Sequence, residues 1–129
     1  MASPRLLLAD THVVLWALTN DPHLTRSART LLTRAQRVFV STASLWEMSI
    51  KARLGKLTLP DRFGSLALTD RGYGLLPITA DHALEVRNLP LHHHDPFDRM
   101  LIVQAQLEDL TLVSHDAAMQ RYDVALLPI

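Results

Sequence analysis

The 129-residue chain contains no cysteine, only four glycines, and few aromatic residues (5%). Without cysteine there are no disulfides, thiolate metal sites or cysteine nucleophiles, and a reducing cytosol suits the chain. No uncharged apolar run approaches the roughly 18 residues of a membrane-spanning helix. The leucines after Arg5 do not make a signal peptide, because Asp10 and His12 interrupt them and no small-residue cleavage site follows. We therefore expect a cytoplasmic protein that does not associate with membranes.

Composition and charge further limit the class of protein to which the chain can belong. Apolar residues make up 48% and charged residues 20% of the chain, which is typical of a globular protein and excludes intrinsic disorder. The length predicts one domain over residues 1–129. The net charge is zero, but residues 1–60 hold eight Lys or Arg against three acids, and residues 61–129 hold five against ten. This split indicates either a polyanion-binding surface beside an acidic site, or two ordinary solvated faces.

Short apolar runs alternate with segments of helical periodicity, which predicts an α/β fold with a mostly parallel sheet. Strands are expected at residues 6–9, 38–40, 75–78, 110–113 and 124–127. Helices are expected at residues 11–18, 25–35, 42–54, 60–70, 79–89 and 95–107, with a short one after Asp116. Ser41 or Thr42, Thr79 and Asp95 are the expected helix caps, and Gly55 is expected to end a helix.

Helical periodicity also predicts which apolar side chains are buried. Trp16 and Trp46 are expected in the core, although Trp46 could instead stack on a nucleobase. In the helix expected at residues 60–70, Phe63, Leu66 and Ala67 are expected to face inward.

Four acids stand at positions that suggest chemistry: Asp10, Glu47, Asp98 and Asp116. Asp10 directly follows the first strand, and Asp116 comes soon after the fourth. In an open parallel sheet, ligands bind beyond the carboxyl ends of the strands, at the switch point in strand order. Asp10 and Asp116 therefore converge if the first and fourth strands are neighbours. Asp98 lies in the first turn of the helix opened by Asp95 and Pro96, and joins them only if the fold brings that helix end over.

A cluster of this kind is suited to a hard divalent cation. Mg²⁺ prefers oxygen ligands and keeps several waters. Without a cation, neighbouring carboxylates repel one another and some must be protonated. A bound Mg²⁺ or Mn²⁺ can polarise a phosphodiester and activate water. The alternative is that Asp10, Asp95, Asp98 and Asp116 only cap helices or favour their dipoles, whereas Glu47, in an apolar part of its helix, needs another partner.

Four segments resemble, in order, the motifs of PIN domains, in particular the VapC-type toxins of toxin–antitoxin pairs: LLLADTHVVLWAL, VSTASLWEMSIKARLGKL, HHHDPFDRMLIVQA and LTLVSHDAAM. The resemblance implies a three-layer fold with sheet order 3-2-1-4-5, and a Mg²⁺ or Mn²⁺ site made by Asp10, Glu47, Asp98 and Asp116. It also implies hydrolysis of single-stranded or looped RNA, a homodimer, and a cognate VapB-like antitoxin. The sequence departs from many PIN domains at Ala117 and Ala118, where they carry a further acid.

Further residues are candidates for supporting the four acids. Asp10 and Asp116 are expected to contact the metal directly or through water, and Glu47 is expected to hold a metal-bound water. Asp98 is expected to be a third direct ligand or to lie just behind the direct ligands. Thr11 and Ser114 could orient the acids, as hydroxyl groups behind metal ligands do, or only satisfy local backbone groups. Asp95 could replace the missing acid.

Substrate contacts are expected from basic residues and one histidine. Arg99 could bind a phosphate, neutralise the carboxylates, or form a structural salt bridge. Lys51, with Arg53 and Lys56, could follow an RNA backbone or lie on a solvated face. His93 could line the groove, whereas three consecutive histidines rarely converge on one metal ion. The second reading of the whole chain is a non-catalytic PIN-like module that binds RNA or a protein; a receiver-type domain or phosphatase lacks support, since the sequence has no Asp-x-Asp after the first strand and no late lysine.

Overall fold

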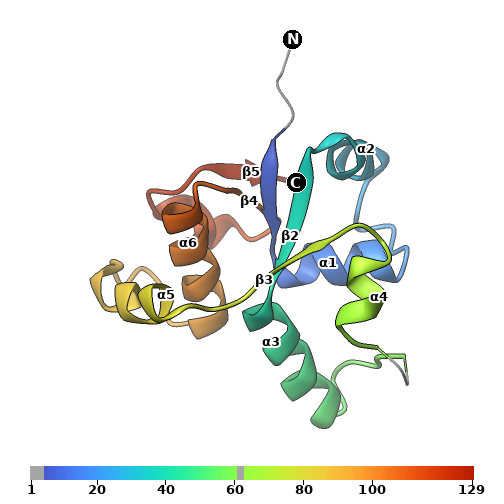
Figure 1. Cartoon of the computed structure of the whole chain (residues 1–129), viewed down its shortest axis with the longest axis horizontal. Coiled ribbons are helices and arrows are strands. Elements are labelled where there is room, and N and C mark those ends of the chain that lie inside the picture. The colour runs from blue at the N-terminus through green and yellow to red at the C-terminus, as the bar shows by residue number, and fades with distance from the viewer. Residues whose placement is uncertain (1–4, 61–62) are drawn as a thin grey trace.

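The computed structural model describes residues 5–60 and 63–129. Five strands form one sheet in the order β3-β2-β1-β4-β5 (Figure 1). The strands are β1 (Leu6–Ala9), β2 (Arg37–Ser41), β3 (Gly74–Leu76), β4 (Thr111–Ser114) and β5 (Leu126–Pro128). Every pairing is parallel. The predicted α/β class and the strand order 3-2-1-4-5 are therefore confirmed, and the sheet is entirely parallel.

Helices cover both faces of the sheet (Figure 1). The helices are α1 (Thr11–Leu18), α2 (Arg26–Arg34), α3 (Thr42–Arg53), α4 (Ser65–Thr69), α5 (Ala80–Glu85) and α6 (Pro96–Glu108), with short 3₁₀ turns η1 (Val86–Asn88) and η2 (Ala117–Arg121). In the central strand β1, Leu7 and Ala9 belong to the core under α1, α2 and α4, and Leu8 belongs to the core under α6. This alternation follows from the two-residue period of a strand and leaves both faces apolar, as a buried parallel sheet requires.

Local sequence chemistry sets the helix ends. The side chains of Ser41, Thr79 and Asp95 accept backbone N–H groups in the first turns of α3, α5 and α6. Each satisfies a donor that the helix itself cannot pair. Gly55 follows α3 with φ +74°, a conformation that glycine adopts without steric cost. The predicted starts of these helices are confirmed.

The structure differs from the sequence-based expectation in three places. The helix expected at residues 60–70 is only α4, and the expectation for residues 61–62 lies outside the described residues. Leu66 is 70% exposed and Leu68 is buried instead, because the helix begins later and presents another face. Trp46 is 62% exposed, so its expected place in the core is wrong, whereas Trp16 packs against the core. Strand β5 begins two residues later than expected.

Among the described residues, no helix is both long and apolar enough to cross a membrane.

The strand order determines which residues meet at the carboxyl edge of the sheet. Strands β1 and β4 are neighbours, with Ala9 opposite Val113, so the residues after both strands emerge side by side.

Candidate functional site

Asp10 leaves the carboxyl end of β1 and is held from three directions. Its backbone N–H donates to the carbonyl of Val113 at 3.0 Å, which continues the β1–β4 ladder by one residue. Its Oδ1 accepts the N–H of Val13 at 3.0 Å and caps α1, and its Oδ2 accepts the hydroxyl of Ser114 at 2.5 Å. Only 4% of Asp10 is exposed. The carboxylate is therefore fixed in place at the edge of the sheet.

Ser114, the last residue of β4, connects Asp10 to Asp116. Its hydroxyl oxygen accepts the backbone N–H of Asp116 at 3.0 Å while its hydrogen goes to Asp10. Asp116 is exposed, and its Oδ1 accepts the N–H of Ala118 to cap η2. This geometry supports the orienting role predicted for Ser114, because its one hydroxyl contacts both the carboxylate of Asp10 and the backbone N–H of Asp116.

Glu47 comes from α3 and is 7% exposed. Its Oε1 accepts the hydroxyl of Thr11 at 2.7 Å, and its Oε2 forms an ion pair with Lys51 at 2.9 Å. Thr11 also lies 2.9 Å from the hydroxyl of Ser44. These contacts bind the start of α1 to the middle of α3 and supply the partners that a buried carboxylate needs.

Asp98 lies in the first turn of α6, where its N–H donates to Asp95 Oδ1 at 3.0 Å. Burial, followed by the negative charges of Asp95, Asp116, Asp10 and Glu47, raises the pKa of Asp98 from 3.8 to about 7. Four separate segments therefore present carboxylates to one small region. Sequence predicted this set, and the structure brings its members within reach of one another's charge.

Burial also raises the pKa of Asp10. The hydrogen bonds from Ser114 and from the N–H of Val13 oppose this rise because they stabilise the ionised form, while the charge of Asp116 adds to it. Burial is the main reason that the ionised forms of Asp10 and Asp98 are disfavoured, and the neighbouring carboxylates add to it, so a bound cation would stabilise the ionised forms of both acids.

The donor set fits a hydrated divalent cation. Among the residues that the structure describes, no three His, Asp or Glu side chains are close enough to make a ready cage. Mg²⁺ does not need one, because it usually takes one or two carboxylates and keeps several waters. Asp10 and Asp116 follow adjacent strands, and carboxylate oxygens such as theirs are ligands that Mg²⁺ prefers.

A hollow of about 350 Å³ opens beside Asp10 and Asp116. It is also lined by His12, Trp16 and His115. The ring centroid of Trp16 lies 5.9 Å from that of His12 and 5.3 Å from that of His115. Sequence analysis did not place these three residues at the site. A signal was present, since each histidine lies within two residues of a predicted acid.

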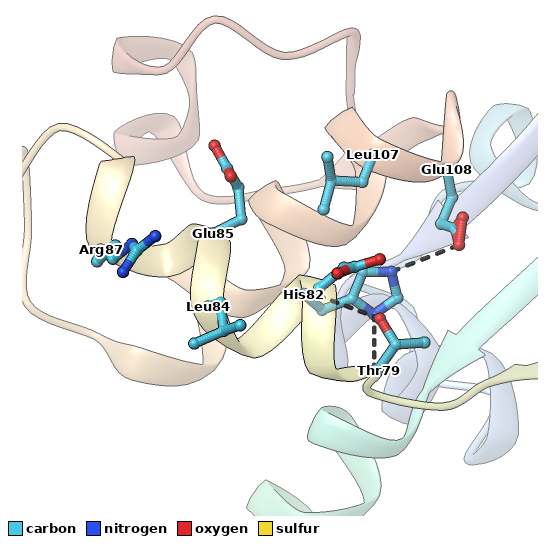
Figure 2. A pocket seen from close by; sticks show the side chains of 8 residues that line it. Thr79, His82, Leu84, Glu85, Arg87, Leu107 and Glu108 are labelled. Atoms are coloured by element: carbon cyan, nitrogen blue, oxygen red, sulfur yellow. Dashed lines mark hydrogen bonds and ion pairs between the residues drawn. The ribbon is translucent and has the colours of Figure 1, made fainter.

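A second hollow, of about 540 Å³, lies elsewhere, between α5 and α6 (Figure 2). Its buried member His82 accepts the N–H of Thr79 at Nδ1 and lies 3.4 Å from Glu108. These contacts complete the cap of α5 and attach it to α6, so His82 has a structural task.

Of the roles considered for Arg99, the structure favours a structural one, although its partners are carbonyl and hydroxyl groups and not the carboxylate of a salt bridge. Its guanidinium is buried and donates to the carbonyls of Pro90 and Leu89 and to the hydroxyl of Tyr122. None of its hydrogen bonds among the described residues reaches a carboxylate. Arg99 therefore holds the segment before α6 against the helix, because only a buried cation can satisfy so many carbonyl groups at once.

The remaining predicted residues divide into two groups. His93 Nε2 lies 3.5 Å from Asp98 Oδ2, and Asp95 caps α6 beside the same carboxyl. Lys51 is held at the site by its ion pair with Glu47. Arg53, at the end of α3, and Lys56, just beyond it, are exposed. His93, Asp95 and Lys51 are thus brought to the acidic cluster, in contact with its members.

The fold and the site together define a parallel-sheet α/β protein with a carboxylate centre at the switch point of its strands. Residues 7–125 match the family model of the PIN domain. The chain belongs to the PIN domain family. A comparison with curated protein sequences finds no match.

Solved structures share the fold at low sequence identity. VapBC2 from Rickettsia felis, bound to a fragment of promoter DNA, has a chain with a TM-score of 0.72 and 16% identity, covering 95% of this chain and 98% of its own. A chain of DNA-bound VapBC from Salmonella typhimurium has a TM-score of 0.66 and 18% identity, and the match covers 98% of this chain and 98% of that one. A chain of FitAcB from Neisseria gonorrhoeae has a TM-score of 0.65 and 21% identity, and the match covers 94% of this chain and 96% of that one.

Proposed function

We propose that this chain is a divalent-metal-dependent endoribonuclease and the toxin of a toxin–antitoxin pair. The observation that carries the proposal has three parts: Asp10 and Asp116 follow the adjacent strands β1 and β4, the charges of both raise the pKa of Asp98, and Glu47 accepts the hydroxyl of Thr11, the residue after Asp10. Membership of the PIN family, whose domains are generally nucleases, and the likeness to chains of VapBC complexes support it. The substrate is single-stranded or looped RNA, and hydrolysis leaves a 5′-phosphate and a 3′-hydroxyl.

Each acid has a task that follows from its surroundings. Asp10 and Asp116 would hold Mg²⁺ or Mn²⁺ directly or through water, and Asp98 would be a third ligand, either direct or through a metal-bound water. The bound cation would supply Lewis-acid polarisation of the phosphodiester and a water of lowered pKa. Glu47, fixed by Thr11 and Lys51, orients the attacking water through its carboxylate. The hydroxyl of Ser114 holds the carboxylate of Asp10 and the backbone of Asp116 in fixed positions relative to each other.

The proposed partners are a second copy of the chain and a VapB-like antitoxin. Several large apolar side chains are more than half exposed: Trp46, Leu54, Leu66, Leu84 and Leu91. A contiguous patch of such side chains is typical of a protein interface, whereas single exposed apolar side chains are ordinary on a protein surface. The absence of a spanning helix among the described residues is compatible with the proposed cytoplasmic location.

A non-catalytic PIN-like module that binds RNA or protein is the second candidate. Ala117 and Ala118 favour it, because they stand where many PIN domains carry a further acid. Titration of the protein with Mn²⁺ in a calorimeter separates the two candidates. Binding in the micromolar to millimolar range supports the nuclease, and no binding at millimolar Mn²⁺ supports the module.

The activity test uses total bacterial RNA incubated with the protein in Mg²⁺, Mn²⁺ or EDTA, with new 5′ ends read by sequencing. Asp10→Asn is the informative variant, since asparagine retains the cap of α1 while removing the charge. Asp123→Asn, which changes an exposed acid, is the matched control. We expect cleavage by the wild type and the control in either metal, and none by Asp10→Asn or in EDTA. Cleavage that persists in EDTA, or equal activity of Asp10→Asn, contradicts the metal mechanism.

A further inference from the structure

His93 has a buried ring nitrogen whose task the fold leaves open. Its Nε2 is one of two buried side-chain polar atoms that lack a hydrogen-bond partner among the described residues. Buried polar groups are nearly always paired, so an exception calls for a reason. The neighbouring group is the carboxylate of Asp98, whose Oδ2 lies 3.5 Å from Nε2.

The other ring nitrogen of His93 faces the hydroxyl of Tyr122 at 2.7 Å. That hydroxyl already accepts two hydrogen bonds, one from the backbone N–H of His93 and one from Nη1 of Arg99, both at 3.2 Å. A phenolic oxygen has two lone pairs and one hydrogen. Because both lone pairs are used, the hydrogen of Tyr122 goes to Nδ1 of His93.

The tautomer of His93 follows from this count. Nδ1 accepts a hydrogen bond, so the proton of the neutral ring is on Nε2, which faces Asp98. A protonated Nε2 cannot bind a metal ion and can only donate. Arg99 sets the orientation of the Tyr122 hydroxyl, Tyr122 sets the tautomer of His93, and the N–H of His93 is left aimed at one oxygen of Asp98.

The geometry points to His93 as the positioning residue that holds the carboxylate of Asp98 toward the cation. This inference rests on the proposed function, because it takes Asp98 as a ligand. The contact of 3.5 Å is longer than an ordinary hydrogen bond, and such contacts often shorten only when the site is loaded. With Oδ2 engaged by His93, the other oxygen of Asp98 is the one presented to the metal or its water.

The same network gives Arg99 and Tyr122 a part in the site without contact with substrate. Tyr122 is 5% exposed and Arg99 is 9% exposed, so neither offers a surface to RNA. Their effect reaches Asp98 only through His93. His92 and His94, on either side in the chain, are exposed and make no hydrogen bond to Asp98 in the described structure.

Two measurements on the full chain test the inference. The first is ¹⁵N NMR of the histidine rings in metal-free protein, which separates the two tautomers. We expect His93 to carry its proton on Nε2, and Tyr122→Phe to abolish that preference. A proton on Nδ1 in the neutral wild type overturns the inference, whatever the activity of the protein.

The second measurement is the dissociation constant for Mn²⁺ by calorimetry, with thermal unfolding to confirm that each variant is folded. His93→Ala is expected to weaken Mn²⁺ binding about 10- to 100-fold, the usual effect of removing a group that orients a ligand. His93→Gln keeps an N–H donor near the position of Nε2 and is expected to stay within roughly threefold of the wild type. His94→Ala, an exposed neighbouring histidine, is the control and is expected to bind as the wild type does.

The outcomes separate this inference from the proposed function. Unchanged Mn²⁺ binding by folded His93→Ala overturns the inference and leaves the nuclease standing. Binding by His93→Gln as weak as that of His93→Ala also overturns it, because the N–H is then not the group that matters. Absence of Mn²⁺ binding by the wild type overturns the proposed function, and with it the role of His93 at a metal site.

Discussion

Replacing Asp98 with asparagine should stabilise the metal-free protein at alkaline pH. The surroundings of Asp98 raise its pKa from 3.8 to about 7, which at about 1.4 kcal/mol for each pKa unit corresponds to about 4 kcal/mol. Because the pKa is higher in the folded than in the unfolded chain, the stabilising contribution of the protonated acid is complete below about pH 4. It is lost as the pH rises through about 7.

The magnitude can be followed between two convenient pH values. At pH 4.5 the unfolded carboxyl is already largely ionised, so about 3 kcal/mol of the effect falls between pH 4.5 and pH 8. Asp98→Asn has no such titration. The free energy of unfolding of the variant, relative to the wild type, should therefore rise by about 3 kcal/mol over this interval, or roughly 10 °C in Tm.

The assay is urea or thermal unfolding in EDTA at both pH values, with Asp123→Asn as the control for loss of an exposed negative charge. The difference between the two pH values cancels those effects of the substitution that do not depend on pH, such as altered packing. A change below about 1 kcal/mol would contradict this prediction, because it would mean that Asp98 is not buried beside the other carboxylates in solution. Saturating Mn²⁺ should stabilise the wild type at pH 8 and stabilise the variant less.

Three further substitutions test individual contacts. Ser114→Ala removes the hydrogen bond that favours ionised Asp10, so the acidic limb of Mn²⁺ affinity measured against pH should move to higher pH; an unmoved limb contradicts the contact. Arg99→Ala should lower the free energy of unfolding in urea by about 3 kcal/mol, because several buried carbonyls lose their donor; a loss below about 1 kcal/mol contradicts a structural role. Trp46→Ala should cost less than about 1 kcal/mol in the same assay, since the side chain is 62% exposed, against roughly 3–5 kcal/mol for a buried tryptophan.

The sequence predicted the parts of this structure that depend on neighbouring residues. Ser41, Thr79 and Asp95 cap helices by accepting N–H groups two or three positions ahead, so the signal and its effect lie in one short segment. Asp10 and Asp116 follow their strands closely enough that the parallel sheet places them at one edge. That β1 and β4 are neighbours was implied by the family resemblance and not by periodicity.

The parts that the sequence did not predict depend on distant segments. Periodicity identifies the faces of α3 but does not say which one meets the core, and the structure turns Glu47 and Met48 inward and Trp46 outward. Arg99 is satisfied by carbonyls whose positions depend on the path of the chain before α6. The pair formed by His93 and Tyr122 joins residues 29 positions apart. No pattern of neighbouring residues in the sequence predicts such contacts.

If side chains from four segments share one divalent cation, anomalous diffraction from a crystal soaked in Mn²⁺ will locate it. We expect a manganese peak between the carboxylates of Asp10 and Asp116, with Asp98 and Glu47 around it, and no peak there in Asp10→Asn crystals. A saturated crystal with no manganese at the carboxyl ends of β1 and β4, or with manganese only at other acids, would contradict it.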